Sequence, residues 1–121
     1  MKPFVIADAA REVRGAYGNV VVARVNDHVV RMSVMTAPFY WHSHPDSDET
    51  FLGVEGRLII DFEDKSVTLE PGEMLTVPAG VVHRTRPADA RSVNLTVERR
   101  DASTERAEDK PAWHDPTSRP S

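Results

Sequence analysis

Short stretches in which apolar and polar residues alternate recur along this chain, and turn-forming residues separate them. Because the side chains of a strand point alternately to its two faces, this period of two predicts strands rather than helices. The first two predicted strands form a hairpin across Asn26-Asp27, a pair typical of tight turns. The predicted strands are residues 19–25, 28–35, 49–54, 57–62, 66–70, 74–77, 81–86 and 91–99.

The last predicted strand, 91–99, alternates over its whole length. Its apolar and polar side chains face opposite ways, as in a half-buried strand: Val93, Leu95 and Val97 against Ser92, Asn94, Thr96 and Glu98. Helical periodicity is almost absent, apart from a possible turn of helix at 7–13. About eight short strands with so little helix predict an all-β fold, either an antiparallel sandwich or a barrel. We see no internal repeat and expect one domain.

The length and the composition divide the chain into three parts. The 121 residues suffice for one core, and we expect an N-terminal arm at 1–17, a β-barrel domain at 18–99 and a polar C-terminal tail at 100–121. The tail has little apolar content beyond Trp113 and a few alanines, so it cannot bury a core of its own. We expect it to be partly disordered, or to dock on a partner subunit through Trp113.

Charge and cysteine usage exclude several classes of protein. The chain has no cysteine, which excludes a disulfide framework and a thiolate metal site. The net charge of -4, a pI near 5.7 and the lack of a basic patch argue against a nucleic-acid partner. No apolar run approaches the length of a membrane span, and Asp8 interrupts the N-terminus too early for a signal peptide. We therefore expect a cytoplasmic protein without a membrane partner.

The candidate chemistry lies in His42-Ser43-His44, followed by Glu49. Residues two apart on a strand project from the same face, so His42 and His44 can present both imidazoles together. Glu49 lies an odd number of residues beyond His44, so a turn must intervene to bring its carboxylate to that face. The run Pro-Asp-Ser-Asp at 45–48 is rich in turn-forming residues and supplies one.

His83 follows a second turn signal, the Pro-Ala-Gly of 78–80, and a return strand can bring it beside the pair. Three imidazoles and one carboxylate suit one divalent metal ion per chain: iron, manganese, nickel, cobalt or zinc. Ligand type alone does not select among these metals. An isolated H-x-H on a strand is more often a polar pair on a solvated face. Here a carboxylate, a third histidine and two turn signals accompany it, which favours the metal site.

These spacings resemble the two motifs of the cupin superfamily. The first motif is matched by His42-x-His44, Glu49 and Gly56. The second motif is matched by Gly72, Pro78-x-Gly80 and His83. Two positions depart from the family pattern: Thr36 replaces the leading glycine of the first motif, and Pro87 replaces the asparagine that often closes the second.

The resemblance narrows the expected fold to an antiparallel jelly-roll barrel, also called a double-stranded β-helix, of the small single-domain type. It implies the metal ligands His42, His44, Glu49 and His83. Similar single-domain cupins commonly form homodimers by exchanging or pairing terminal strands, so we expect a homodimer.

Four protein ligands leave coordination positions open for a small chelating molecule such as a hydroxy-ketone, diketone, catecholate or sugar. By parity with the histidines, Phe39 and Trp41 should point away from this site. The candidate pocket residues are Tyr40, Phe51, Arg31 and Met35. For two of them a plainer role stays open, because Phe51 can belong to the ordinary core and Arg31 can be solvated or salt-bridged.

Two classes of function remain. The first is a metal-dependent enzyme, of dioxygenase or isomerase type, in which Glu49 or a bound hydroxide is the catalytic group that moves a proton. The second is a non-catalytic module that binds or senses a small molecule or a metal. No Ser/His/Asp order and no glycine-rich phosphate loop offers another chemistry, and His28 and His114 are interpreted as surface residues.

Overall fold

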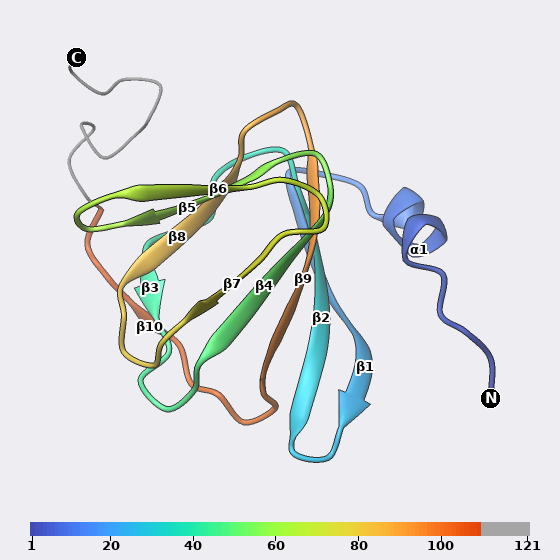
Figure 1. The fold of residues 1–121 in the computed structure, drawn as a ribbon, viewed down its shortest axis with the longest axis horizontal. Helices are drawn as coiled ribbons and strands as arrows, with labels where there is room; N and C mark the ends of the chain where they lie inside the picture. The colour runs from blue at the N-terminus through green and yellow to red at the C-terminus, as the bar shows by residue number, and fades with distance from the viewer. Residues whose placement is uncertain (110–121) are drawn as a thin grey trace.

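The computed structural model describes residues 1–109, which form one short helix and ten strands (Figure 1). In chain order these elements are α1 (Ile6–Glu12), β1 (Tyr17–Val25), β2 (His28–Met35), β3 (His42–Ser43), β4 (Glu49–Glu55), β5 (Leu58–Phe62), β6 (Ser66–Leu69), β7 (Met74–Val77), β8 (His83–Pro87), β9 (Ser92–Arg99) and β10 (Glu105–Arg106). The expectations for Trp113 and His114 concern residues outside the described part of the chain.

The strands form two five-stranded antiparallel sheets. The first sheet has the order β1-β2-β9-β4-β7 and the second the order β10-β3-β8-β5-β6 (Figure 1). After β2 the chain passes repeatedly from one sheet to the other, which is the winding of a double-stranded β-helix. The predicted all-β jelly roll is therefore confirmed. This winding also brings together β3, β4 and β8, the strands that carry the candidate ligands.

Tight turns set the register of this winding. Asn26 has a positive φ of 54° at the first position of the two-residue turn between β1 and β2. The type I′ and type II′ turns that join such hairpins both require a positive φ there. Gly56, with a φ of 63°, joins β4 to β5. A Cβ atom at Gly56 would collide with the backbone carbonyl of Arg91, so this position needs glycine for space as well as for conformation.

Two hydrophobic clusters hold the sheets in place. One lies inside the barrel and is made of Met35, Phe51, Leu58, Ile60, Leu69 and Val77. The other lies on the outer face of the first sheet, where Ala10 of α1 packs against Met32, Val34 and Val93. The helix therefore covers part of a surface that would otherwise be apolar and exposed.

Strand β9 reverses the usual polarity of a half-buried strand. Its polar side chains Ser92, Asn94, Thr96 and Glu98 are buried inside the barrel. Its apolar side chains face outward, where Val93 is covered by the helix and Val97 is 40% exposed. The alternation along 91–99 was therefore correct as a pattern, but the interior that it faces is polar. An interior lined in this way indicates a site rather than a plain core.

Eight strands coincide with predicted ones to within two residues at each end. The remaining two, β3 and β10, have two residues each and were not predicted as strands. Strand β10 lies in the segment expected to be a polar tail, and its Glu105 and Arg106 pair with Ser43 and His42 of β3. Among residues 1–109 no helix is long and apolar enough to cross a membrane.

Candidate metal centre

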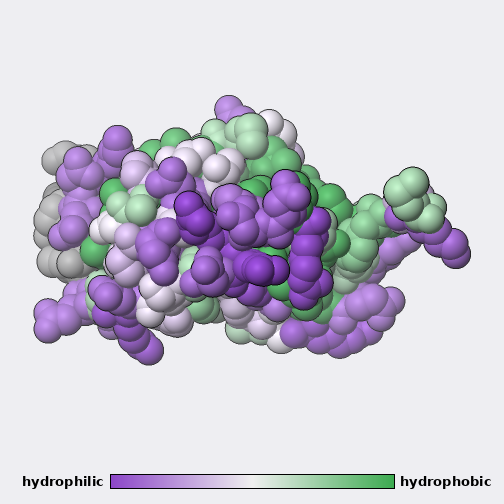
Figure 2. All heavy atoms as spheres, turned by 90° about the horizontal axis from the view of Figure 1, so that it is seen from below, coloured by the Kyte–Doolittle hydropathy of each residue, from purple (hydrophilic) through white to green (hydrophobic). Residues whose placement is uncertain are grey.

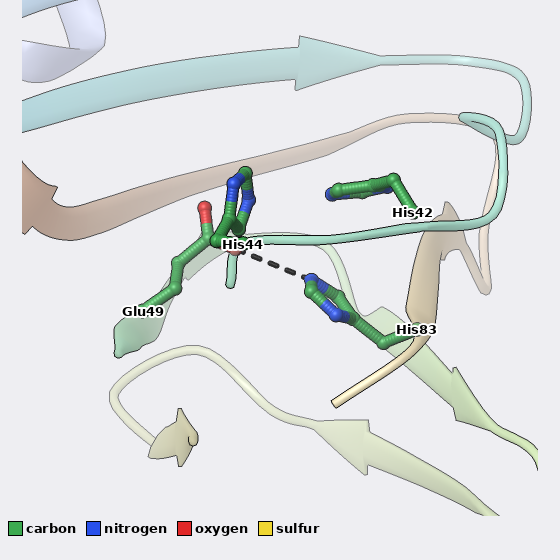
Figure 3. Close-up of side chains that lie close together, drawn as sticks. All are labelled: His42, His44, Glu49 and His83. Carbon is green, nitrogen blue, oxygen red and sulfur yellow. Dashed lines mark hydrogen bonds and ion pairs between the residues drawn. The ribbon is translucent and has the colours of Figure 1, made fainter. Parts of the chain in front are cut away.

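Four buried side chains from three neighbouring parts of the barrel meet at one point (Figure 3). His42 lies on β3, His44 directly after it, Glu49 opens β4 and His83 opens β8. His42 and His83 are paired residues across β3 and β8. One ligand atom from each of the four side chains can be chosen so that all lie within 4.8 Å of one another. The structure thus brings together the four residues that the sequence motifs indicated.

The turn at 45–48 carries Glu49 back to the histidines, as its sequence suggested. Three of its side chains anchor it. Asp48 accepts a hydrogen bond from the Ala79 amide at 2.8 Å, and Ser47 accepts one from the Arg99 amide at 3.0 Å. Asp46 accepts one from the Ser103 amide at 2.9 Å. The turn is therefore tied to the loop before β8, to the end of β9 and to the segment before β10.

Backbone carbonyls orient all three imidazoles. Nδ1 lies 2.8 Å from the Tyr40 carbonyl in His42, 3.0 Å from the Ser103 carbonyl in His44 and 2.9 Å from the Val81 carbonyl in His83. A carbonyl can only accept, so each Nδ1 must be the protonated donor. The neutral rings then keep their lone pairs on Nε2. This is the tautomer that ligation through Nε2 requires, and such outer hydrogen bonds are common around metal-binding histidines.

The carboxylate of Glu49 dominates the electrostatics of the site. Burial alone would raise the pKa of Glu49, but contacts with His44 and His83 outweigh burial and lower the pKa to about 2. The Glu49 carboxylate in turn raises the pKa of His44 to about 9. Burial lowers the pKa of His42 to about 4. Without a metal, the site therefore holds an anionic Glu49, a neutral His42 and a protonated His44 at neutral pH.

These four residues fit a divalent metal ion. Oε1 of Glu49 lies 3.2 Å from Nε2 of both His44 and His83. Even so, Nε2 of His44 is buried without a hydrogen bond of acceptable geometry. A buried polar atom without a partner is unfavourable, and a metal ion would satisfy this nitrogen together with the other three ligand atoms. Imidazole nitrogen and carboxylate oxygen are ligands that iron, manganese, nickel, cobalt and zinc accept.

A cavity of about 280 Å³ opens beside the site, and three of the four ligands, His42, His44 and Glu49, line it. Three of the four predicted pocket residues, Arg31, Tyr40 and Phe51, line it. Met35 does not line the cavity. It shares the inner face of β2 with Arg31, but it lies farther along the strand, where the core cluster with Phe51 and Leu58 buries it completely. Phe51 belongs both to this core and to the cavity wall.

Sequence reasoning missed most of the cavity wall. The residues concerned are Tyr17, Asn19, Ser33, Phe39, Thr85, Asn94, Thr96, Glu98, Ala102 and Thr104. Phe39 was expected to point away, but residues 36–41 are not a strand, so parity does not apply to them. The polar row on β9 was visible in the sequence. Its meaning depended on which face of the strand lines the barrel, which alternation alone does not say.

Comparison with known proteins agrees with the fold and the motifs. A family model described as "Cupin domain" matches residues 28–97. The protein YdbB of Bacillus subtilis (strain 168), described as uncharacterized, is 47% identical over 103 residues, which are 84% of this chain and 90% of that protein.

Two crystal structures show the same architecture. A cupin-2 domain containing protein from Shewanella frigidimarina superposes with a TM-score of 0.75 at 31% identity, over 80% of this chain and 94% of that chain. A Klebsiella pneumoniae protein described as having a double-stranded beta-helix domain gives a TM-score of 0.75 at 20% identity, over 90% of this chain and 99% of that chain. At this lower identity the likeness shows the fold alone.

Proposed function

The chain belongs to the cupin family, and we propose that it binds one divalent metal ion per chain and uses it on a small chelating molecule. We propose further that it is a metal-dependent enzyme of dioxygenase or isomerase type. The observation that carries the proposal is the convergence of four buried ligand atoms within 4.8 Å, next to a cavity of about 280 Å³. The ligands are His42, His44, Glu49 and His83.

A divalent ion held there would supply a Lewis acid with positions open toward the cavity. The residues around it have separate tasks. The three imidazoles are held in the ligating tautomer, and Glu49, with its pKa lowered to about 2, stays anionic at neutral pH, as a ligand must. The same low pKa makes Glu49 a weak base. That Glu49 moves a proton during a reaction is a prediction from the sequence. Phe39 and Phe51 contribute apolar surface to the wall of the cavity.

Metal analysis of protein purified without added metal tests the binding proposal. The parent is expected to carry about one equivalent of a transition metal per chain. His42→Ala and His83→Ala should lose most of it, because each removes one of the four ligands. His28→Ala is the matched control, since His28 lies in a hairpin and contacts Asp27 at the surface. Equal metal content in the parent and in both site variants would contradict the proposal.

Measurements of turnover distinguish a metal-dependent enzyme from a non-catalytic binding module. Oxygen consumption or product formation by the iron(II) or manganese(II) form, lost in His83→Ala, would support the enzyme. Thermal stabilisation by small chelating molecules with no turnover across a broad panel would instead favour the non-catalytic module.

A further inference from the structure

The cavity beside the metal centre has one wall made of polar side chains from the inner faces of β2 and β9. Thr96 lies opposite Arg31 of β2 on one side and opposite Phe51 of β4 on the other. Glu98 follows two residues along the same face of β9. Nε of Arg31 lies 3.4 Å from Oε1 of Glu98 and forms an ion pair with it. Arg31 also donates a hydrogen bond to Oδ1 of Asn19 at 3.2 Å.

Two oxygen atoms of this wall are buried without a hydrogen-bond partner: Oγ1 of Thr96 and Oε2 of Glu98. Their residues are 3% and 8% exposed, and both line the cavity. Buried polar atoms are rarely left unsatisfied in folded proteins, so the expected partner is water or a ligand in the cavity. Oε2 of Glu98 lies 3.8 Å from Nε2 of His44, which places the unsatisfied oxygen beside the metal ligands.

The chemistry of these atoms restricts what the partner can be. An ionised carboxylate only accepts hydrogen bonds, whereas a threonine hydroxyl both donates and accepts. A hydroxyl group of a ligand has the chemistry that both atoms need, because it can donate to Glu98 and accept from Thr96. A diketone without hydroxyl groups offers no donor to Glu98.

The charges around the cavity favour an acidic ligand. Arg31 and Glu98 balance each other as an ion pair. A divalent ion next to the anionic Glu49 leaves one positive charge in a partly enclosed site. A ligand with a single negative charge would neutralise that charge, which matters because an uncompensated charge is costly away from bulk water.

We propose that the cavity takes a small hydroxy acid that carries a hydroxyl group beyond its chelating end. The chelating end lies at the metal centre, and the additional hydroxyl binds Oε2 of Glu98 and Oγ1 of Thr96. This inference rests on the proposed function, because the chelating end needs the metal. It adds the ligand class and names Thr96 and Glu98 as the residues that select it.

A pair of probes that differ in one hydroxyl group tests the inference. Lactate and glycerate share the 2-hydroxycarboxylate unit, and glycerate adds one hydroxyl at the next carbon. Both are titrated into the cobalt(II)-loaded protein, and binding is followed by the visible absorption of the ion. We expect glycerate to bind about tenfold more tightly, the usual size of one hydrogen bond to a charged acceptor.

Two variants locate the effect. Thr96→Val keeps the shape of the side chain and removes the hydroxyl, so it should weaken glycerate severalfold and leave lactate within about twofold. Glu98→Gln removes the charge of the acceptor and should also reduce the preference for glycerate. Thr50→Val is the matched control, because Thr50 lies on the outer face of the same sheet and bonds to Thr76. It should bind both acids like the parent.

The outcomes separate this inference from the proposed function. Cobalt uptake by the parent is measured first, and a failure to bind cobalt overturns both. If cobalt binds but the two acids bind equally well, solvent satisfies the two oxygens and the inference alone is overturned. A preference for glycerate that survives in both Thr96→Val and Glu98→Gln overturns it as well. Loss of cobalt from Glu98→Gln would make Glu98 a metal ligand and would also overturn it.

Discussion

His42 and His83 are paired across β3 and β8, and the same local contact orients both rings. In each, Nδ1–H donates to the carbonyl oxygen two residues earlier in the chain, that of Tyr40 or that of Val81. The ring centroids lie 4.5 Å apart. Because the backbone just before each strand fixes the imidazole that opens the strand, the two Nε2 atoms are aimed at the centre before any metal arrives. Such preorganisation lowers the cost of binding.

Metal binding should release a proton near neutral pH. In the metal-free site the Glu49 carboxylate raises the pKa of His44 to about 9, so an incoming ion must displace the His44 proton. We expect release of about one proton per ion at pH 7.5, and an affinity that rises about tenfold per pH unit up to about pH 9. Calorimetry in buffers of different ionisation enthalpy measures the proton count. A count of zero would contradict this protonation state.

The stability of the metal-free protein should fall as the pH rises, whereas the metal affinity should rise. The folded-state pKa of His44, about 9, lies above the unfolded value of 6.5. The stabilisation from its contact with Glu49 is therefore complete below about pH 6.5 and is lost as the pH rises through 9. His42 and Glu49 have lowered pKa values, so their effects fall at lower pH. Thermal unfolding at pH 6.5 and pH 9.5, in the presence of a chelator, checks the sign.

Asp48 should support the metal centre from outside it. Its Oδ1 accepts the Ala79 amide at 2.8 Å and so joins the turn before Glu49 to the loop before His83. Asp48→Ala should weaken metal binding about tenfold, as loss of an outer contact commonly does, while Asp48→Asn keeps the acceptor and should restore it. Competition with a chromophoric chelator measures the affinity. The exposed Asp64 gives a control, Asp64→Ala, and an Asp48→Ala affinity equal to that of this control would refute the prediction.

Gly56 and Gly72 make a matched pair for stability. Both have positive φ, 63° and 91°, but a Cβ atom would collide with the Arg91 carbonyl only at Gly56, whereas nothing lies within 4 Å at Gly72. Gly72→Ala should cost about 1 kcal/mol of the free energy of unfolding for its backbone conformation alone. Gly56→Ala should cost about 3 kcal/mol or more, because the turn must also move away from the Arg91 carbonyl. Urea unfolding measures both losses of stability. Equal losses for the two variants would argue against the close approach of Gly56 to the Arg91 carbonyl.

The protein is expected to be a homodimer in solution. The outer face of the first sheet exposes Val20, Met74 and Val97 by 43%, 63% and 40%. Figure 2 shows hydrophobic side chains gathered toward the side of the molecule where the N-terminal segment lies. Exposed apolar side chains of this kind are often covered by a second subunit. Light scattering at micromolar concentration should give twice the mass of the chain, and a monomer mass would count against the dimer.

Much of the fold was predictable from the sequence because its determinants are local. Period-two alternation and turn residues such as Asn26-Asp27 act within a few neighbouring residues, so eight strands were placed to within two residues. The four candidate ligands were found for a similar reason, since His42 and His44 lie two residues apart and Glu49 follows a recognisable turn. Only their convergence with His83 is non-local, and it was predicted from the resemblance to the second family motif.

The tertiary structure decided which side of each strand lines the cavity. Alternation on β9 shows that its two faces differ, but either face can be turned inward. In this barrel the inner face lines a cavity, so the polar side chains of Thr96 and Glu98 are the buried ones. Met35 and Phe39 were misplaced because their surroundings depend on distant packing and on a segment that is not a strand. The sequence by itself thus determined the strands and the four candidate ligands, and packing determined the walls around them.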